Sequence, residues 1–150
     1  MKTKVVVIAL SVLGSVMFFL SNAFANPDPE VPLPVSKRQA LQLNVPVDIE
    51  KGARIFAGCS GCHDAGPSAI NRIGPKLNAL IGRKAGSVEG YGYSKALLKA
   101  GKNGLVWTPY KLDAFLMAPN VFLSGNKMPF KGIKDVIARR DLIGYLKTLN

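Results

Sequence analysis

Residues 59–63 read Cys59-Ser60-Gly61-Cys62-His63, and this short stretch decides what the chain can be. It holds both cysteines and the one histidine of the 150-residue sequence. Two thiols three positions apart can add to the two vinyl groups of a haem, and the adjacent imidazole is then placed to ligate the iron from one face. The motif therefore predicts one covalently attached haem c per chain.

The same cysteine spacing has two other uses, a redox-active dithiol and a plain structural disulfide. A redox dithiol normally follows a β-strand in a βαβ unit, and no stretch of this sequence alternates in a way that predicts a strand. A single histidine also excludes sites that need two imidazoles from one chain, such as two-histidine zinc sites and bis-histidine haems.

The amino terminus has the features of a secretory signal. After two early lysines, residues 5–20 form an apolar run, and Ala23-Phe24-Ala25 places small residues at the two positions that a leader peptidase reads. We expect cleavage after Ala25 and a periplasmic mature protein. A retained membrane anchor is the alternative, because residues 5–24 could just span a bilayer.

Residues 26–47 form a proline-rich spacer between the signal peptide, residues 1–25, and the folded domain, residues 48–150. Prolines at this density neither continue a helix nor donate to a sheet ladder, so we expect an extended or flexible segment. The prolines are Pro27, Pro29, Pro32, Pro34 and Pro46.

The domain is predicted to be all-α. Start and stop signals indicate five short helices: one capped by Asp48 and ending at Gly58, one over residues 75–81, one over residues 94–100 stopped by Gly101, one over residues 108–118, and one beginning near Asp135. The connections over residues 82–92 and 120–134 are long and irregular for so small a domain. A large bound cofactor would give them a surface to wrap around.

Methionine is the remaining candidate for the sixth iron ligand. Outside the leader the sequence holds Met117 and Met128. Met117 falls within the helix predicted over residues 108–118, where a lone methionine is usually core filler. Met128 lies in a loop that its proline and glycine can hold rigid, so the pattern favours Met128, with Met117 as the alternative. A thioether ligand raises the reduction potential relative to bis-histidine ligation and closes the iron to substrates.

Several further motifs follow the haem motif in order, and with them residues 48–150 resemble a class I cytochrome c, of the small soluble bacterial, mitochondrial-like type. The motifs are Gly74-Pro75, Leu80-Ile81-Gly82-Arg83-Lys84, Tyr91-Gly92-Tyr93-Ser94, Trp107, Gly125-Asn126-Lys127-Met128-Pro129-Phe130 and Arg139-Arg140-Asp141-Leu142-Ile143-Gly144-Tyr145-Leu146.

The resemblance implies a class I cytochrome c fold, in which short helices and long loops wrap around one covalently attached haem and the first and last helices cross at Gly52 and Tyr145. It implies that the Pro75 carbonyl accepts a hydrogen bond from His63, which fixes the ring and raises its basicity. Donors to the haem propionates would be Arg83, Tyr93, Trp107 and, in place of the family's usual threonine, Asn126.

The sequence departs from the family pattern at Phe115. By the resemblance this position commonly holds a tyrosine whose hydroxyl contacts the methionine sulfur. Phenylalanine has no hydroxyl, so that bond cannot be made here.

These features predict a single-electron carrier of a respiratory chain and not an enzyme, because a saturated haem without catalytic carboxylates nearby can exchange an electron and little else. The 20 Lys and Arg against 9 Asp and Glu give a net charge of +11, and loss of the leader with its two lysines would leave +9. Such a charge favours docking on acidic redox proteins, the electron donor and acceptor. By the resemblance, the docking residues around the haem edge are Arg72, Lys127, Phe130, Lys131 and Lys134.

Export makes nucleic acid an unsuitable target for the basic charge. We expect a monomer that meets the membrane only transiently, through redox complexes, unless the leader is retained. Two other functions stay open on the sequence: a haem subunit of a larger dehydrogenase or oxidase complex, and a five-coordinate gas-binding or peroxidatic haem protein.

Overall fold

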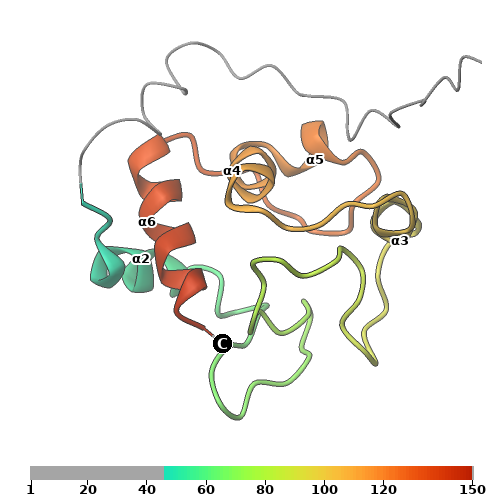
Figure 1. Cartoon of the computed structure of the whole chain (residues 1–150), viewed down its shortest axis with the longest axis horizontal. Helices are drawn as coiled ribbons and strands as arrows, with labels where there is room; N and C mark the ends of the chain where they lie inside the picture. Colours follow the sequence, from blue (N-terminus) through green and yellow to red (C-terminus); the bar gives the residue numbers. More distant parts are fainter. Residues whose placement is uncertain (1–45, 150) are drawn as a thin grey trace, which may run out of the picture. The chain divides into compact units, whose positions relative to one another are not determined.

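The structure is a computed structural model that describes residues 46–149. The predicted leader, residues 1–25, and all but the last two residues of the spacer lie outside the described residues. In chain order the described helices are α2 (Ile49–Phe56), α3 (Lys95–Lys102), α4 (Pro109–Met117), α5 (Pro119–Phe122) and α6 (Val136–Lys147) (Figure 1). Within this part of the chain the only extended pairing is a bridge between Lys84 and Val106, so the predicted all-α class is confirmed. None of the described helices is long and apolar enough to cross a membrane.

The four longer helices begin where the sequence predicts a start, and each is capped by a side-chain oxygen. Asp48, Ser94 and Thr108 each accept a hydrogen bond from the backbone N–H three residues on. Asp135 accepts two, from the N–H groups of Ile137 and Ala138. These bonds satisfy donors that the first turn of a helix leaves without an intrahelical partner.

The prediction of a helix over residues 75–81 is wrong, because the backbone there makes hydrogen bonds to distant residues and not within the segment. The Leu77 N–H donates to the carbonyl of Asp64 at 2.9 Å, and the Ala79 N–H donates to Leu149. The Arg83 guanidinium donates hydrogen bonds to the carbonyls of Lys76 and Asn78, at 3.2 and 2.8 Å. With these groups committed elsewhere, no i to i+4 ladder can form.

Two further helix boundaries differ from the prediction. Helix α3 does not stop at Gly101 but continues through it to Lys102. Gly101 is buried there, because the Ala85 carbonyl lies where its Cβ would be. The loop predicted over residues 120–134 also contains the short helix α5, in which Pro119 occupies the first position instead of only ending α4.

The first and last described helices, α2 and α6, cross where the sequence predicts. Gly52 of α2 is buried against α6, and a Cβ at this position would lie 2.8 Å from the Cβ of Tyr145. The Phe56 and Tyr145 rings pack beside the crossing, with their centroids 5.4 Å apart. The crossing fixes the position of α2, and therefore the point at which the chain leaves α2 and enters the haem motif.

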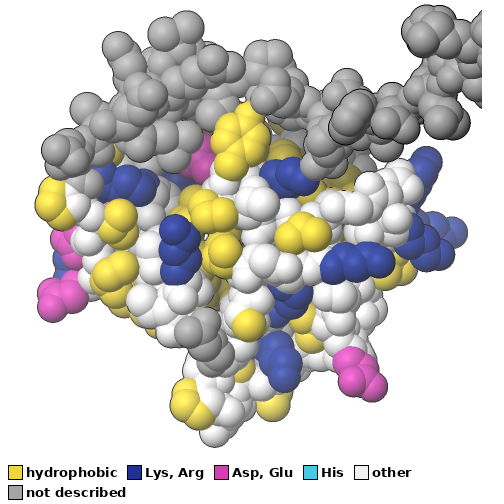
Figure 2. Space-filling model, in the orientation of Figure 1, with side chains coloured by type: hydrophobic (Ala, Val, Ile, Leu, Met, Phe, Trp, Pro, Cys, Tyr) yellow, Lys and Arg dark blue, Asp and Glu magenta, His cyan; other side chains and the backbone are white. Residues whose placement is uncertain are grey.

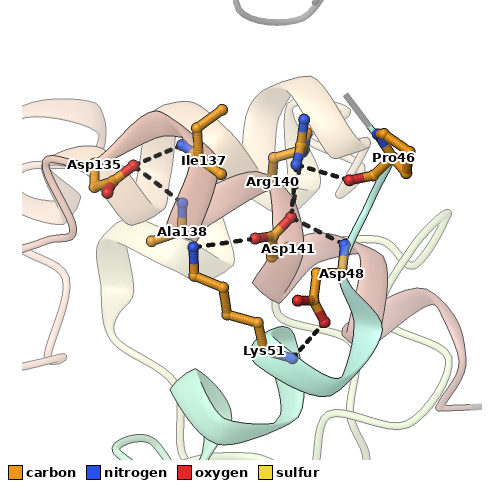
Figure 3. Close-up of polar contacts among 8 residues, drawn as sticks. All are labelled: Pro46, Asp48, Lys51, Asp135, Ile137, Ala138, Arg140 and Asp141. Carbon is orange, nitrogen blue, oxygen red and sulfur yellow. Dashed lines mark hydrogen bonds and ion pairs between the residues drawn. The ribbon is translucent and has the colours of Figure 1, made fainter. Parts of the chain in front are cut away.

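A buried carboxylate fastens the start of α2 to α6. Asp141 is 1% exposed, and it accepts hydrogen bonds from the Asp48 backbone N–H at 3.2 Å and from the Arg140 guanidinium at 2.9 Å (Figure 3). The Lys51 ammonium lies 3.7 Å from its other oxygen. Arg140 also donates to the Pro46 carbonyl at 3.0 Å, so the last spacer residues are part of this network.

A second buried ion pair ties α6 to α4. The Arg139 side chain is fully buried, and its Nε donates to the Asp113 carboxylate at 2.6 Å. Its Nη1 donates to the carbonyls of Ile133 and Lys134, at 2.8 and 3.0 Å. Each charge is thereby hydrogen-bonded, which is the condition for burying charges without a large loss of stability.

We predict that Gly52→Ala destabilises the haem protein, by about 1–3 kcal/mol, the usual cost of overpacking a close contact. The added methyl would overlap the Asp141 carbonyl and force α2 and α6 apart. Denaturant unfolding followed by haem absorbance measures the loss. Gly61→Ala is the control, because no atom lies within 4 Å of a Cβ at that position. Equal stability of the two variants would contradict a tight crossing.

Candidate functional site

A cavity of about 620 Å³ lies at the centre of the domain. Helices α3, α4 and α6, the end of α2 and the loops between them all contribute to its lining, which is mainly apolar. All nine residues predicted to bind haem line it, namely Cys59, Cys62, His63, Pro75, Arg83, Tyr93, Trp107, Asn126 and Met128. Met117, the alternative ligand, is not among the lining residues.

The haem motif follows α2 through tight turns. The N–H of Cys59 donates to the Phe56 carbonyl at 2.7 Å, and the N–H groups of Cys62 and His63 both donate to the Cys59 carbonyl at 3.0 Å. Residues three apart on such a helical turn share a face, so both sulfurs point to the same side of the chain. Burial, and to a lesser degree the neighbouring Cys62, raises the pKa of the Cys59 thiol.

The His63 ring is held from two directions. Its Nδ1 lies 2.8 Å from the Pro75 carbonyl oxygen, and the ring occupies the space where a Cβ of Gly74 would be. A carbonyl can only accept a hydrogen bond, so Nδ1 carries the proton. The lone pair is therefore on Nε2, the nitrogen left for a metal. The Gly74 N–H donates to the Cys62 carbonyl at 2.7 Å, which closes this segment onto the motif.

The loop that carries Met128 is organised by Asn126. The Asn126 side-chain oxygen accepts from the Met128 backbone N–H at 2.9 Å. Its amide nitrogen donates to the Asn120 side chain at 2.8 Å and to the Leu123 carbonyl at 3.0 Å. Both amide hydrogens are used within the loop, so Asn126 lines the cavity but has no hydrogen left for a propionate.

Arg83, Tyr93 and Trp107 bring hydrogen-bond donors to the cavity. Burial lowers the pKa of the Arg83 guanidinium. Burial also raises the pKa of the Tyr93 phenol, partly offset by a hydrogen bond from the Val88 backbone and by the Arg83 charge. Tyr93 is therefore protonated at neutral pH and available as a donor. Donors in a mainly apolar cavity fit a cofactor that carries buried carboxylates.

The predicted docking residues are not all brought together. Lys127 and Phe130 line the cavity, whereas Arg72, Lys131 and Lys134 do not. The Lys127 ammonium lies 3.4 Å from the Gly92 carbonyl, and that of Lys134 lies 3.0 Å from the Met117 carbonyl at the end of α4. A cation there interacts favourably with the helix dipole, so Lys134 has a structural contact of its own.

Basic charge also extends beyond the predicted docking residues. On the face drawn in Figure 2, Lys and Arg side chains gather over the helix labelled α3 in Figure 1. This helix has no acidic residue, and its lysines, Lys95, Lys99 and Lys102, are all exposed. Their spacing places them on one face of the helix, where neighbours three and four apart lie side by side.

Sequence reasoning missed several residues that shape the site. Asn120, which receives the Asn126 amide, and Tyr91, whose hydroxyl donates to the Ile73 carbonyl at 2.6 Å, carry no local signal of these roles. Gly74 was expected only as part of a Gly-Pro motif. Its lack of a side chain is what lets the imidazole approach the backbone.

Together, the cavity, the two cysteines on one turn, the oriented imidazole and the thioether define a protein that binds haem c. No protein-family model matches the chain. It is 48% identical over 99 residues to cytochrome c2 of Agrobacterium tumefaciens (strain II Chrys), covering 66% of this chain and 89% of that protein. It is 45% identical over 100 residues to cytochrome c-550 of Ancylobacter novellus, covering 67% and 94%.

Solved structures agree with these relatives. Cytochrome c2 from Rhodospirillum centenum superposes with a TM-score of 0.66 at 37% identity, covering 69% of this chain and 98% of the other. Cytochrome cH from Methylobacterium extorquens gives a TM-score of 0.61 at 39% identity, covering 67% and 98%. The chain belongs to the class I cytochromes c. Its cofactor is covalently attached haem c, and the Cys59 to His63 motif has the required spacing.

Proposed function

We propose that the protein is a periplasmic single-electron carrier that shuttles electrons between a reductase or dehydrogenase and a terminal oxidase or reductase. The observation that carries the proposal is the geometry around His63 and Met128. A histidine fixed with Nε2 free and a methionine line one cavity, so these two side chains would hold the iron of a bound haem through one nitrogen and one sulfur. The relatives, cytochromes c2 and c-550, support a soluble electron carrier.

Each site residue is proposed to have one role. Cys59 and Cys62 attach the haem, and His63 and Met128 ligate its iron. Pro75 holds the His63 tautomer through its carbonyl. Donors to the propionates are Arg83, Tyr93 and Trp107, while Asn126 holds the Met128 loop in place.

Bound haem supplies exchange of one electron between ferric and ferrous iron. The chain contributes a fixed geometry and exclusion of water. The imidazole is held by a backbone carbonyl, and the methionine loop by an asparagine, so the chain itself positions both candidate ligands. A bound haem held by both residues would have no position free for a substrate, so the chain is proposed to make and break no bonds and therefore not to act as an enzyme.

The partners are proposed to be acidic redox proteins that meet the cavity mouth, with Lys127 and Phe130 in contact and Arg72, Lys131 and Lys134 contributing charge. The net charge of +9 that remains without the leader and its two lysines supports long-range attraction. The same proposal includes a signal peptide at residues 1–25, its cleavage after Ala25, and a spacer before the domain. The reason is that c-type carriers of this design work outside the cytoplasmic membrane.

We predict that Met128→Ala leaves the haem attached but opens the iron, since attachment depends on the motif alone. The midpoint potential should fall, cyanide should bind faster, and the charge-transfer absorbance of the methionine–iron bond should be lost. Met117→Ala is the matched control, because Met117 lies outside the cavity lining. The ligand assignment is wrong if the control shows these changes and Met128→Ala does not.

We also predict that Phe115→Tyr raises the midpoint potential. Phe115 lines the same cavity as Met128, and a hydroxyl donated to the sulfur would weaken the thioether as an electron donor to ferric iron. Protein-film voltammetry measures the shift. Phe122→Tyr is the control, because Phe122 packs on Phe115 at 5.8 Å between ring centroids but does not line the cavity. An equal shift in both variants would assign the effect to general polarity.

A third prediction for this function concerns charge. Lys127→Glu/Lys131→Glu should slow bimolecular electron transfer with an acidic protein by about tenfold or more at low ionic strength, because steering contributes roughly 10- to 10³-fold. The effect should fade as salt rises, since exposed charges are screened over about 8–10 Å at physiological ionic strength. Lys102→Glu/Lys147→Glu makes the same change in net charge at exposed sites outside the cavity lining. Equal slowing by both pairs would mean that net charge, not the mouth, governs docking.

A further inference from the structure

The loop that carries Met128 is closed at its base and braced inside. At the base, the Ile133 N–H donates to the Leu116 carbonyl at 2.8 Å, which brings the end of the loop back to α4. Inside the loop, the Asn126 amide nitrogen donates to the Asn120 side-chain oxygen at 2.8 Å. Asn120 belongs to α5 and lies six residues before Asn126. One side-chain hydrogen bond therefore links the start of this loop to the turn that precedes Met128.

The orientation of the Asn126 side chain is fixed by two backbone groups. The Met128 N–H can only donate, so the atom that receives it at 2.9 Å is the side-chain oxygen. The Leu123 carbonyl can only accept, so the atom that reaches it at 3.0 Å is the amide nitrogen. The second amide hydrogen is given to Asn120, which must therefore present its oxygen and not its nitrogen. Asn120 is an acceptor here, and a substitution can test this property.

The helix that presents Asn120 is firmly packed. Pro119, the first residue of α5, is fully buried. The Phe122 ring at the other end of α5 packs on the Phe115 ring of α4, with their centroids 5.8 Å apart. It also stacks on the Trp107 ring, with a centroid separation of 6.1 Å. Asn120 itself is exposed, so the packing of α5 sets its position and makes it a fixed acceptor for the loop.

Two side chains that could have restrained Met128 from within the cavity do not do so. Asn126 lines the cavity, but both of its amide hydrogens are used inside the loop. Phe115 also lines the cavity, and it carries no hydroxyl to donate to the sulfur. The polar restraint that the structure shows acts instead on the Met128 backbone, where the Asn126 oxygen accepts the N–H. Whatever holds the Asn126 side chain therefore bears on the position of the thioether.

We propose that Asn120 is a positioning residue for Met128, because by accepting the Asn126 amide it keeps the loop in the conformation that presents the thioether to the iron of a bound haem. The proposal rests on the proposed electron-carrier function, in which Met128 is an iron ligand. Asn120 does not line the cavity, so it acts through Asn126 and not by contact with the cofactor. Loss of its oxygen should let the sulfur leave the iron more often, while the haem stays attached.

The experiment uses the full haem protein in its ferric form, with imidazole as a competing ligand. At high imidazole concentration the rate of binding no longer depends on that concentration and equals the rate at which Met128 leaves the iron. Stopped-flow absorbance of the methionine–iron charge-transfer band measures this rate. We expect Asn120→Leu, which has a similar shape but no acceptor, to raise the rate by roughly two- to tenfold, the fold-change that corresponds to the loss of one ordinary hydrogen bond.

Three further variants make the result specific. Asn120→Asp is the rescue variant, because a carboxylate of the same shape still accepts the Asn126 amide, and its rate should equal or fall below that of the natural protein. Val121→Thr changes the next residue of α5, which is 86% exposed, and should leave the rate unchanged. Asn126→Ala removes the amide that Asn120 accepts, so the addition of Asn120→Leu to this variant should have no further effect.

A second measurement reports on the loop itself and not on ligand exchange. The Met128 backbone N–H is protected from solvent exchange by its bond to the Asn126 oxygen. Its hydrogen exchange, followed by NMR in the ferrous protein, should be faster in Asn120→Leu and natural in Asn120→Asp. The Ala69 N–H, which donates to the Gly66 carbonyl in a surface turn of another loop, should exchange at the natural rate in both variants.

The positioning role is overturned if Asn120→Leu leaves the rate or the exchange of the Met128 N–H unchanged, or if Asn120→Asp is as fast as Asn120→Leu. It is also overturned if Asn120→Leu has the same effect in the Asn126→Ala background, because Asn120 would then act by another route. A natural ferric protein without methionine–iron absorbance would instead contradict the ligation of Met128, on which the electron-carrier function rests.

Discussion

The hydrogen bond between His63 and the Pro75 carbonyl is the constraint on which the rest of the site depends. It fixes the proton on Nδ1, so that Nε2 keeps the lone pair, and it joins the haem motif to a loop twelve residues further along the chain. That loop cannot close as a helix, because its other backbone groups are bonded to Asp64, Leu149 and Arg83. The orientation of the His63 ring and the path of the loop therefore depend on each other, and Gly74 provides the space for the ring.

The helices around the cavity are joined by polar contacts as well as by an apolar core. Two buried ion pairs of this kind lie in the first half of α6. Arg139 joins α6 to Asp113 of α4, and Asp141 joins it to the start of α2. Removing one partner of a buried pair costs about 3–5 kcal/mol, because the remaining charge is left uncompensated. The polar residues are thus part of the frame that joins α2, α4 and α6 around the cavity.

Local signals in the sequence were sufficient for the haem motif, the helix caps and the α2–α6 crossing, because each depends on neighbouring residues or on a resemblance carried by adjacent motifs. They failed where contacts made by the folded loops decide. Residues 75–81 have a helix pattern, but long-range hydrogen bonds use their backbone groups. The amide of Asn126 was expected to face a propionate and is instead occupied by Asn120 and Leu123. The exposure of Ile73 was equally invisible, since an isoleucine in a sequence is by default a core residue.

The entry of the chain into the domain bears on how the carrier meets its partners. Leu142 and Leu146 of α6 line the cavity, whereas Arg140 bonds to Pro46 and Gly144 lies against the Val47 side chain. Positions two apart on a helix are separated by about 200°, so these two pairs of residues occupy opposite faces of α6. The chain therefore enters on the face of α6 turned away from the haem cavity. An attachment through the amino-terminal segment, by a leader or by a larger assembly, would start from that face, which is not the face of α6 that lines the haem cavity.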